Sequence, residues 1–241
     1  MKAIRIISIL AASLVIQGCS TSGRTVSHEW NTSSDPLEGF NRSVYAFNTK
    51  ADKYILRPVA SGYDKTLPEP AKKGVSNFFS NLGEPWSVVN NLLQGKMDRA
   101  LGSTYRFAVN STVGLLGLID VAKHQGVEKT PEDLGQTLAV WGVKPGPYLM
   151  VPFFGPTNLR DGIGRSVSTA AFYPIGEITD SSSARLGLTA LDVVNTRAGL
   201  LAVDEALEKQ LDPYLFIKTT VENSRTDAIN DGNEIEEEFD F

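Results

Sequence analysis

The side chains that could act in catalysis are few in this chain. Its 241 residues include one cysteine, Cys19, and two histidines, His28 and His124. Covalent or metal-assisted catalysis needs a nucleophile with a matched base, or several ligating side chains at suitable spacing. The sequence has neither pattern, and no Gly-x-Ser-x-Gly, P-loop or His-Glu-x-x-His motif occurs in it. We therefore expect a protein that is not an enzyme and that uses no metal or other cofactor.

Paired charges in the middle of the chain have structural explanations. Glu132 and Asp133 follow Pro131, and acids at that place are typical of the first turn of a helix. Thr130 is positioned to cap the same helix. Arg160 and Asp161 are adjacent, which indicates an ion pair that stabilises a turn.

Cys19 lies in a context that explains a single thiol. Lys2 and Arg5 form a basic N-terminal region, residues 6–16 are apolar, and Ile16-Gln17-Gly18-Cys19 resembles a lipobox. The apolar run is shorter than the ~20 residues that a membrane-spanning helix needs. The pattern predicts a signal peptide over residues 1–18, cleavage before Cys19, and covalent lipid on that cysteine.

The most distinctive stretch is residues 135–165, GQTLAVWGVKPGPYLMVPFFGPTNLRDGIGR. It predicts a short helix that ends at Gly142, an apolar hairpin interrupted by prolines, and then another helix. The hairpin contains Tyr148, Leu149, Met150, Val151, Phe153 and Phe154. A loop exposed to water seldom carries such a run. Either it packs beneath the protein's own helices as core, or it contacts lipid.

Two further motifs flank this stretch: DPLEGFNR at residues 35–42, and Asp212-Pro213-Tyr214. Together, and in this order, the three motifs resemble those of the VacJ/MlaA family of outer-membrane lipoproteins, over roughly residues 19–230. Ser20 follows the cysteine that we expect to carry lipid. In lipoproteins an aspartate at that place resembles a signal for retention in the inner membrane, so its absence favours the outer membrane. The resemblance implies a lipid-anchored protein that faces the periplasm.

The function that the resemblance implies is phospholipid transport. A helical ring would lie in the inner leaflet of the outer membrane and remove mislocalised phospholipid from the outer leaflet through a passive channel, which maintains lipid asymmetry. The implied partners are trimeric porins and a soluble periplasmic lipid carrier. We assign the lipid path to residues of the hairpin and its exit, which are Tyr148, Phe153, Phe154, Asn158, Arg160 and Asp161.

Charge divides the chain into a nearly neutral body and an acidic end. Residues 19–230 contain 21 basic and 22 acidic residues, whereas residues 231–241 contain six acids and no base. A nearly neutral body offers no large positive field, so we expect no nucleic-acid partner. The predicted organisation is a flexible tether over residues 19–34, one helical domain over 35–230, and a disordered acidic tail over 231–241.

Apolar periodicity predicts an all-α fold. The helices should be mostly short, and their close breaks favour a curved or ring-like assembly with a central channel. The main expected helices cover residues 37–57, 68–83, 85–95, 97–108, 130–142, 181–211 and 212–229.

Three questions stay open at the level of sequence. The uncharged residues 107–119 either pack as core or lie at a membrane interface. Asn41 and Asn48 either face solvent or line a pore, and the solvent-facing position is the simpler expectation. Finally, a lipoprotein of this kind could be a structural scaffold of the envelope that moves no lipid.

Overall fold

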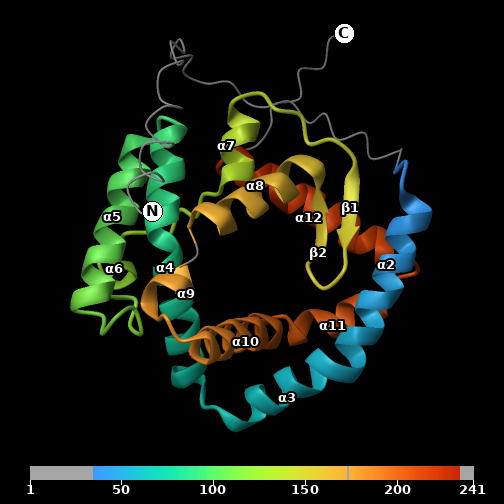
Figure 1. Cartoon of the computed structure of the whole chain (residues 1–241), viewed down its shortest axis with the longest axis horizontal. Coiled ribbons are helices and arrows are strands. Elements are labelled where there is room, and N and C mark those ends of the chain that lie inside the picture. Colours follow the sequence, from blue (N-terminus) through green and yellow to red (C-terminus); the bar gives the residue numbers. More distant parts are fainter. Residues whose placement is uncertain (1–34, 173, 234–241) are drawn as a thin grey trace.

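The computed structural model describes residues 35–172 and 174–233, and they form a ring of helices with one small hairpin (Figure 1). α2 lies on one side of the ring and α4 and α5 on the other, and α3, α10 and α11 join the two sides. α7, α8 and α12 close the ring, and the turn of the hairpin points toward its centre. The all-α expectation is confirmed.

The first helical segment continues through a proline. α2 (Glu38–Ala51), a π-helical turn (Asp52–Leu56) and α3 (Arg57–Thr66) follow without a gap. The prediction that this helix ends before Pro58 was wrong. The π-helical turn closes with a bond from the Arg57 N–H to the Asp52 carbonyl, so Pro58 falls in the first turn of α3, where a missing N–H is tolerated.

α4 (Glu69–Leu93) is one helix, although two helices separated at Gly83 were expected. Pro85 lies inside it. The neighbouring Glu84 makes an ion pair with Arg106 of α5 (Met97–Thr112), with Oε1 and Nε 2.8 Å apart, and both side chains are almost completely buried. This contact between the helices holds α4 together where the proline removes a backbone hydrogen bond.

The middle of the chain contains α6 (Val121–His124), α7 (Leu134–Val140), β1 (Tyr148–Val151) and β2 (Gly155–Asn158). The cap of α7 is Asp133, not Thr130, because Asp133 and Gln136 form a reciprocal capping box. Gly142 was predicted to end this helix. Its φ of +88° is in the left-handed region that glycine adopts just after the last turn of a helix. The strands pair antiparallel and form the predicted hairpin as a small sheet, although no regular strand was expected among its prolines.

The last part of the ring is α8 (Leu159–Ala171), α9 (Pro174–Ile178), α10 (Ser182–Gly199), α11 (Leu201–Glu208) and α12 (Pro213–Ile229). The single helix expected over residues 181–211 is bent by 50° between α10 and α11. Arg197 stabilises the bend, because it binds Asp52 at 2.7 Å and Asp204 at 2.8 Å. Among the described helices none is by itself long and apolar enough to cross a membrane, and the bent pair α10–α11 meets that test only as a pair.

The distribution of polarity is the reverse of that in most soluble proteins. The largest fully buried side chains are polar or charged: Arg106, Glu84, Asn41, Asn90, Asn91, Thr137 and Ser103. The buried hydrophobic cluster is small and consists of Val44, Tyr148, Met150 and Tyr214. Many large hydrophobic side chains are instead exposed around the ring, among them Tyr54, Leu116, Phe153, Phe154 and Leu186.

The uncharged segment 107–119 contributes to this exposed surface and is not core. Val113, Leu115 and Leu116 are each more than 60% exposed. Leu115 and Leu116 also have φ values of 53° and 60°, in the left-handed region that leucine seldom adopts. The fold keeps two strained, exposed leucines at this turn.

Candidate functional site

A cavity of about 370 Å³ lies between the hairpin, α4, α8 and α12. Three of the six residues assigned to a lipid path line it: Tyr148, Asn158 and Asp161. Arg160, Phe153 and Phe154 do not line this cavity. The wall also contains apolar rings, since Trp86 and Phe172 stack with their centroids 5.9 Å apart.

Tyr148 is buried between the hairpin and α12. Its ring meets Tyr214 edge-on, with 6.2 Å between centroids, and the Lys218 ammonium lies 5.6 Å from the Tyr148 ring centroid. Burial, together with the nearby carboxylates Glu222 and Asp35, raises the pKa of the Tyr148 phenol well above its usual range. Tyr148 therefore remains a neutral hydroxyl in the wall of the cavity.

Asn158 and Asp161 form the start of α8. The Asn158 Oδ1 accepts a hydrogen bond from the Asp161 N–H at 2.9 Å, and its Nδ2 donates to the Asp161 carboxylate at 2.6 Å. Asn158 is thus the N-cap of α8. The cap fixes the Asp161 carboxylate at the wall of the cavity.

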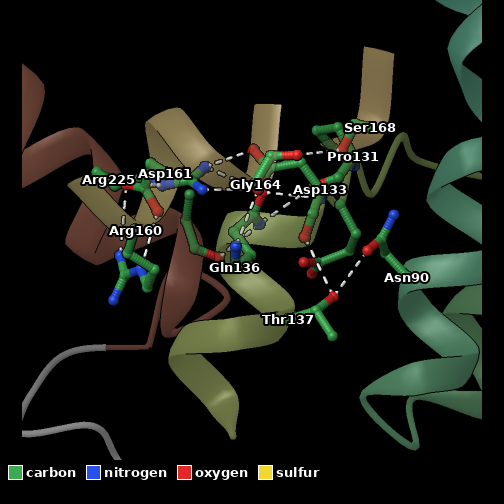
Figure 2. Close-up of polar contacts among 12 residues, drawn as sticks. Asn90, Pro131, Asp133, Gln136, Thr137, Arg160, Asp161, Gly164, Ser168 and Arg225 are labelled. Carbon is green, nitrogen blue, oxygen red and sulfur yellow. Dashed lines mark hydrogen bonds and ion pairs between the residues drawn. The ribbon is translucent and has the colours of Figure 1, made fainter. Parts of the chain in front are cut away.

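Arg225 of α12 connects α7 to α8 through two carboxylates (Figure 2). Its guanidinium binds Asp133 at 2.6 Å and Asp161 at 2.9 Å. Arg160 adds a bond to Asp161 at 2.9 Å and donates to the Val143 carbonyl at 3.2 Å. Burial alone would raise the pKa of Asp161, but the bonds from Arg160 and Arg225 hold it below its usual range. The expected ion pair of Arg160 with Asp161 is present as one part of this larger network.

Two glycines allow α7 and α8 to come close enough for this network. A Cβ on Gly135 would lie 2.5 Å from the Arg225 and Asp161 side chains. A Cβ on Gly164 would lie 2.7 Å from the Gly135 backbone nitrogen. Figure 2 shows Gly164 beside Asp133 and Gln136. At Gly164 only glycine fits without a shift of the backbone, whereas a Cβ at Gly135 would displace the paired side chains of Arg225 and Asp161.

Phe153 and Phe154 lie at the turn of the hairpin and are 77% and 71% exposed. Phe153 has a φ of +64°, in the left-handed region, and its ring meets Phe47 edge-on at 5.2 Å. A bulky side chain in this conformation is uncommon and strained. Both rings are therefore at the accessible surface, which excludes core packing for these two.

Asn41, which is buried, and Asn48, which is half-buried, bind the open edge of β1, so the simpler expectation that both face solvent was wrong. Asn41 Nδ2 donates to the Tyr148 carbonyl at 3.0 Å, and its Oδ1 accepts from the Met150 N–H at 2.9 Å. Asn48 repeats the pattern with the Val151 carbonyl and the Phe153 N–H. Their spacing of seven residues, two helical turns along one face of α2, is the signal in the sequence that could have identified them.

Asp231 belongs to the folded body, although it was counted among the tail acids that have no basic partner. Its carboxylate binds Lys96 at 2.7 Å and also binds Arg99. Lys96 in turn binds the buried Glu132 at 3.0 Å. Burial raises the pKa of Glu132 despite these contacts. The acidic residues 234–241 lie outside the described residues.

Cys19, the signal peptide over 1–18 and the tether over 19–34 also lie outside the described residues. Within residues 35–172 and 174–233, no group of three or more His, Cys, Asp and Glu side chains is placed to hold a metal ion.

Buried polar side chains, many exposed apolar side chains and an amphipathic cavity define the class of this protein: an α-helical ring with an apolar accessible surface. A family model described as "MlaA lipoprotein" matches residues 33–228. The chain belongs to the MlaA lipoprotein family, as its motifs predicted.

Individual relatives agree with this assignment. The chain is 37% identical to "Intermembrane phospholipid transport system lipoprotein MlaA" of Escherichia coli (strain K12), over 96% of this chain and 91% of the relative. It is 30% identical to the protein of the same name from Haemophilus influenzae, over 98% of this chain and 94% of the relative. A solved structure described as "Structural basis for maintenance of bacterial outer membrane lipid asymmetry" is 40% identical, with a TM-score of 0.70, and the match covers 82% of this chain and 99% of that chain.

Proposed function

We propose that this chain is an outer-membrane lipoprotein that removes mislocalised phospholipid from the outer leaflet and passes it to a soluble carrier in the periplasm. Relatives named as intermembrane phospholipid transport lipoproteins support this function. The solved structure that it resembles concerns outer-membrane lipid asymmetry. Clearance of phospholipid from the outer leaflet maintains that asymmetry.

The inverted distribution of polarity is the single observation that carries the proposal. Large side chains buried among the packed helices are Arg, Glu and Asn, whereas Leu116, Leu186, Phe153 and Phe154 are more than two-thirds exposed. Each square ångström of apolar surface left in water costs about 25 cal/mol, and monomers in water seldom expose large apolar patches. Lipid removes that cost. An apolar exterior is what a ring seated in one leaflet needs.

The cavity gives a phospholipid both kinds of surface that it needs. A charged headgroup buried without partners costs many kcal/mol, so a path must offer polar groups beside apolar ones. Asn158, Asp161 and Tyr148 supply polar groups, and the stacked Trp86 and Phe172 supply an apolar wall. The path residues Phe153, Phe154 and Arg160 lie outside this cavity; we assign the two phenylalanines to lipid contact and Arg160 to the support of Asp161.

Attachment and direction follow from parts outside the ring. Acyl chains on Cys19 would anchor the chain at ~0.8 kcal/mol per buried methylene, and residues 19–34 would tether the ring. Transport is passive, and its direction is set by the affinities of partners. We propose trimeric porins beside the ring in the membrane and a soluble periplasmic lipid carrier as these partners.

Loss of the chain from cells tests this function. Intact cells that lack it should accumulate phospholipid accessible to an added phospholipase, and expression of the wild-type chain should restore the low level. A scaffold that moves no lipid would leave the accessible phospholipid unchanged while envelope integrity falls. That result would contradict the proposal.

A further inference from the structure

We propose that the cavity between α4, α8, α12 and the hairpin is a binding site for the phosphate of a phospholipid headgroup, and that Arg165 is the cation that binds it. The inference rests on the proposed function and gives it a specific site. Arg165 lies on α8 and lines the cavity, and its side chain is exposed.

The argument begins with the charges that line the cavity. Each carboxylate there has a basic neighbour: Asp133 and Asp161 bind Arg225, Glu132 binds Lys96, and Glu222 lies 4.0 Å from the Lys218 ammonium. Arg165 differs from these groups. Within the part of the chain that the structure describes, its guanidinium has no hydrogen bond and no ion pair.

An unpaired guanidinium at the wall of a cavity with otherwise paired charges favours an anion. Arginine presents several N–H donors in a plane and matches the oxygens of a phosphate better than lysine does. The carboxylates in the wall would repel a phosphate that came close to them, unless a cation lay between the two. Arg165 therefore marks the part of the cavity where a phosphate is most favoured.

Two further donors in the same wall have no acceptor. The Trp86 Nε1–H and the Tyr148 hydroxyl are buried and make no hydrogen bond to any described residue. Tyr148 is only 5% exposed. A buried donor without an acceptor is uncommon in a folded protein and indicates a place for a ligand or an ordered water. With Arg165, these donors come from three different elements around one cavity.

The apolar part of the wall points to an amphiphile. Trp86 and Phe172 stack with an angle of 9° between their planes, and they form a flat apolar surface beside the donors. Inorganic phosphate would gain nothing from this surface, whereas the glycerol and first acyl carbons of a phospholipid would. The ligand class is a phosphodiester that carries apolar chains.

Binding to the purified full chain in detergent micelles tests the site. The probes are dioleoylphosphatidylglycerol, dioleoylphosphatidylethanolamine, the uncharged dioleoylglycerol and inorganic phosphate, with bound lipid counted by native mass spectrometry. Arg165→Gln should weaken the binding of both phospholipids about tenfold and leave dioleoylglycerol unchanged. Arg165→Lys keeps the charge but loses the planar set of donors, so its affinity should lie between those of the wild-type chain and Arg165→Gln. Lys50→Gln removes an exposed charge from α2 and should change nothing.

Trp86→Phe provides a second variant, because it keeps an aromatic ring and removes the indole N–H. It should weaken phospholipid binding a few-fold, about as much as one lost hydrogen bond. Unchanged phospholipid binding in Arg165→Gln would overturn the site. An equal loss for dioleoylglycerol, or displacement of the lipid by millimolar inorganic phosphate, would also overturn it.

The binding assay and the cellular assay can fail separately. If the wild-type chain clears phospholipid from cells but Arg165→Gln binds it normally, the headgroup site is wrong and the proposed function stands. If Arg165→Gln loses phospholipid affinity but the wild-type chain clears none, the proposed function is wrong and the site stands.

Discussion

Arg225 shows how much of this fold depends on single polar side chains. It lies on α12, binds the N-cap of α7 through Asp133, and binds the first turn of α8 through Asp161. Both its own side chain and that of Asp161 are mostly buried. A buried charge that loses its partner is strongly destabilising, although a complete pair adds little net stability. The network therefore specifies how three helices meet.

Asp161→Asn should lower the free energy of unfolding by about 3 kcal/mol, because it leaves Arg160 and Arg225 with a neutral neighbour. The pKa of Asp161 is held below its usual range in the fold, so its carboxylate stabilises the protein at neutral pH. That contribution should decrease as the pH falls below about 4, the pKa of an aspartate in the unfolded chain. It should be gone once the pH is below the lower pKa that Asp161 has in the folded protein. Melting temperatures measured against pH in detergent would check this.

The matched control is Asp98→Asn, at an exposed position in the first turn of α5. It should change stability by less than about 0.5 kcal/mol. If Asp161→Asn melts like Asp98→Asn at every pH, the Arg225 network does not hold the helices together.

At the scale of elements, the approach of α7 to α8 depends on Gly164. Gly164→Ala would place a Cβ 2.7 Å from the Gly135 backbone nitrogen, so the helices must separate. The cost should be about 1–3 kcal/mol, typical of overpacking. Gly162→Ala on the same helix is the control, since its Cβ would meet only Thr157 at 3.6 Å. That change should be neutral or stabilise by up to about 1 kcal/mol through helix propensity.

The hairpin turn makes a separate prediction. Replacement of Phe153 and Phe154 together by Ser should impair phospholipid clearance from cells while the melting temperature and abundance stay close to wild type, because both rings are exposed. Met150→Ala, at a buried position in β1 of the same hairpin, should instead cost about 2–5 kcal/mol. A large loss of stability in the double variant would assign the two rings to the core, and normal clearance would remove them from the lipid path.

The elements that the sequence predicted well are those with local signals. Asp212-Pro213 starts α12 and Ser181 caps α10, because capping depends on residues within one turn. The errors arise where distant contacts override a local break. Pro58 and Pro85 lie within helices because a π-helical turn and a buried ion pair accommodate them. The spacing of Asn41 and Asn48 places both on one face of α2, but their partner β1 could not be predicted, since it lies more than a hundred positions away.

The site was predictable only in part, for the same reason. The distinctive stretch located Tyr148, Asn158 and Asp161, which meet at one cavity. Arg225 comes from α12 and Trp86 from α4, and no local pattern connects them with that stretch. Only the closure of the ring brings these helices together.

At the scale of the whole molecule, the C-terminal segment links to the start of α5. Deletion of residues 234–241 should leave the melting temperature unchanged, because a run of like charges adds no core. Deletion from Asp231 onward should lower it, since Lys96 and Arg99 then lose a carboxylate partner. The expected difference between the two truncations is about 1 kcal/mol. Equal melting temperatures would show that the Asp231 contacts contribute nothing.

The inverted polarity of the ring leads to the central claim, that the apolar exterior is in contact with lipid. Its most direct test is a photoreactive phenylalanine analogue placed in cells at Phe154, Leu116 and Leu186, which represent three sectors of the exposed apolar surface. Asp98, exposed and polar, is the control position. Irradiation should give phospholipid adducts at the three apolar positions and not at Asp98, as measured by mass spectrometry of the purified chain. Adducts to protein alone at all four positions, or no difference between apolar and polar positions, would contradict the account.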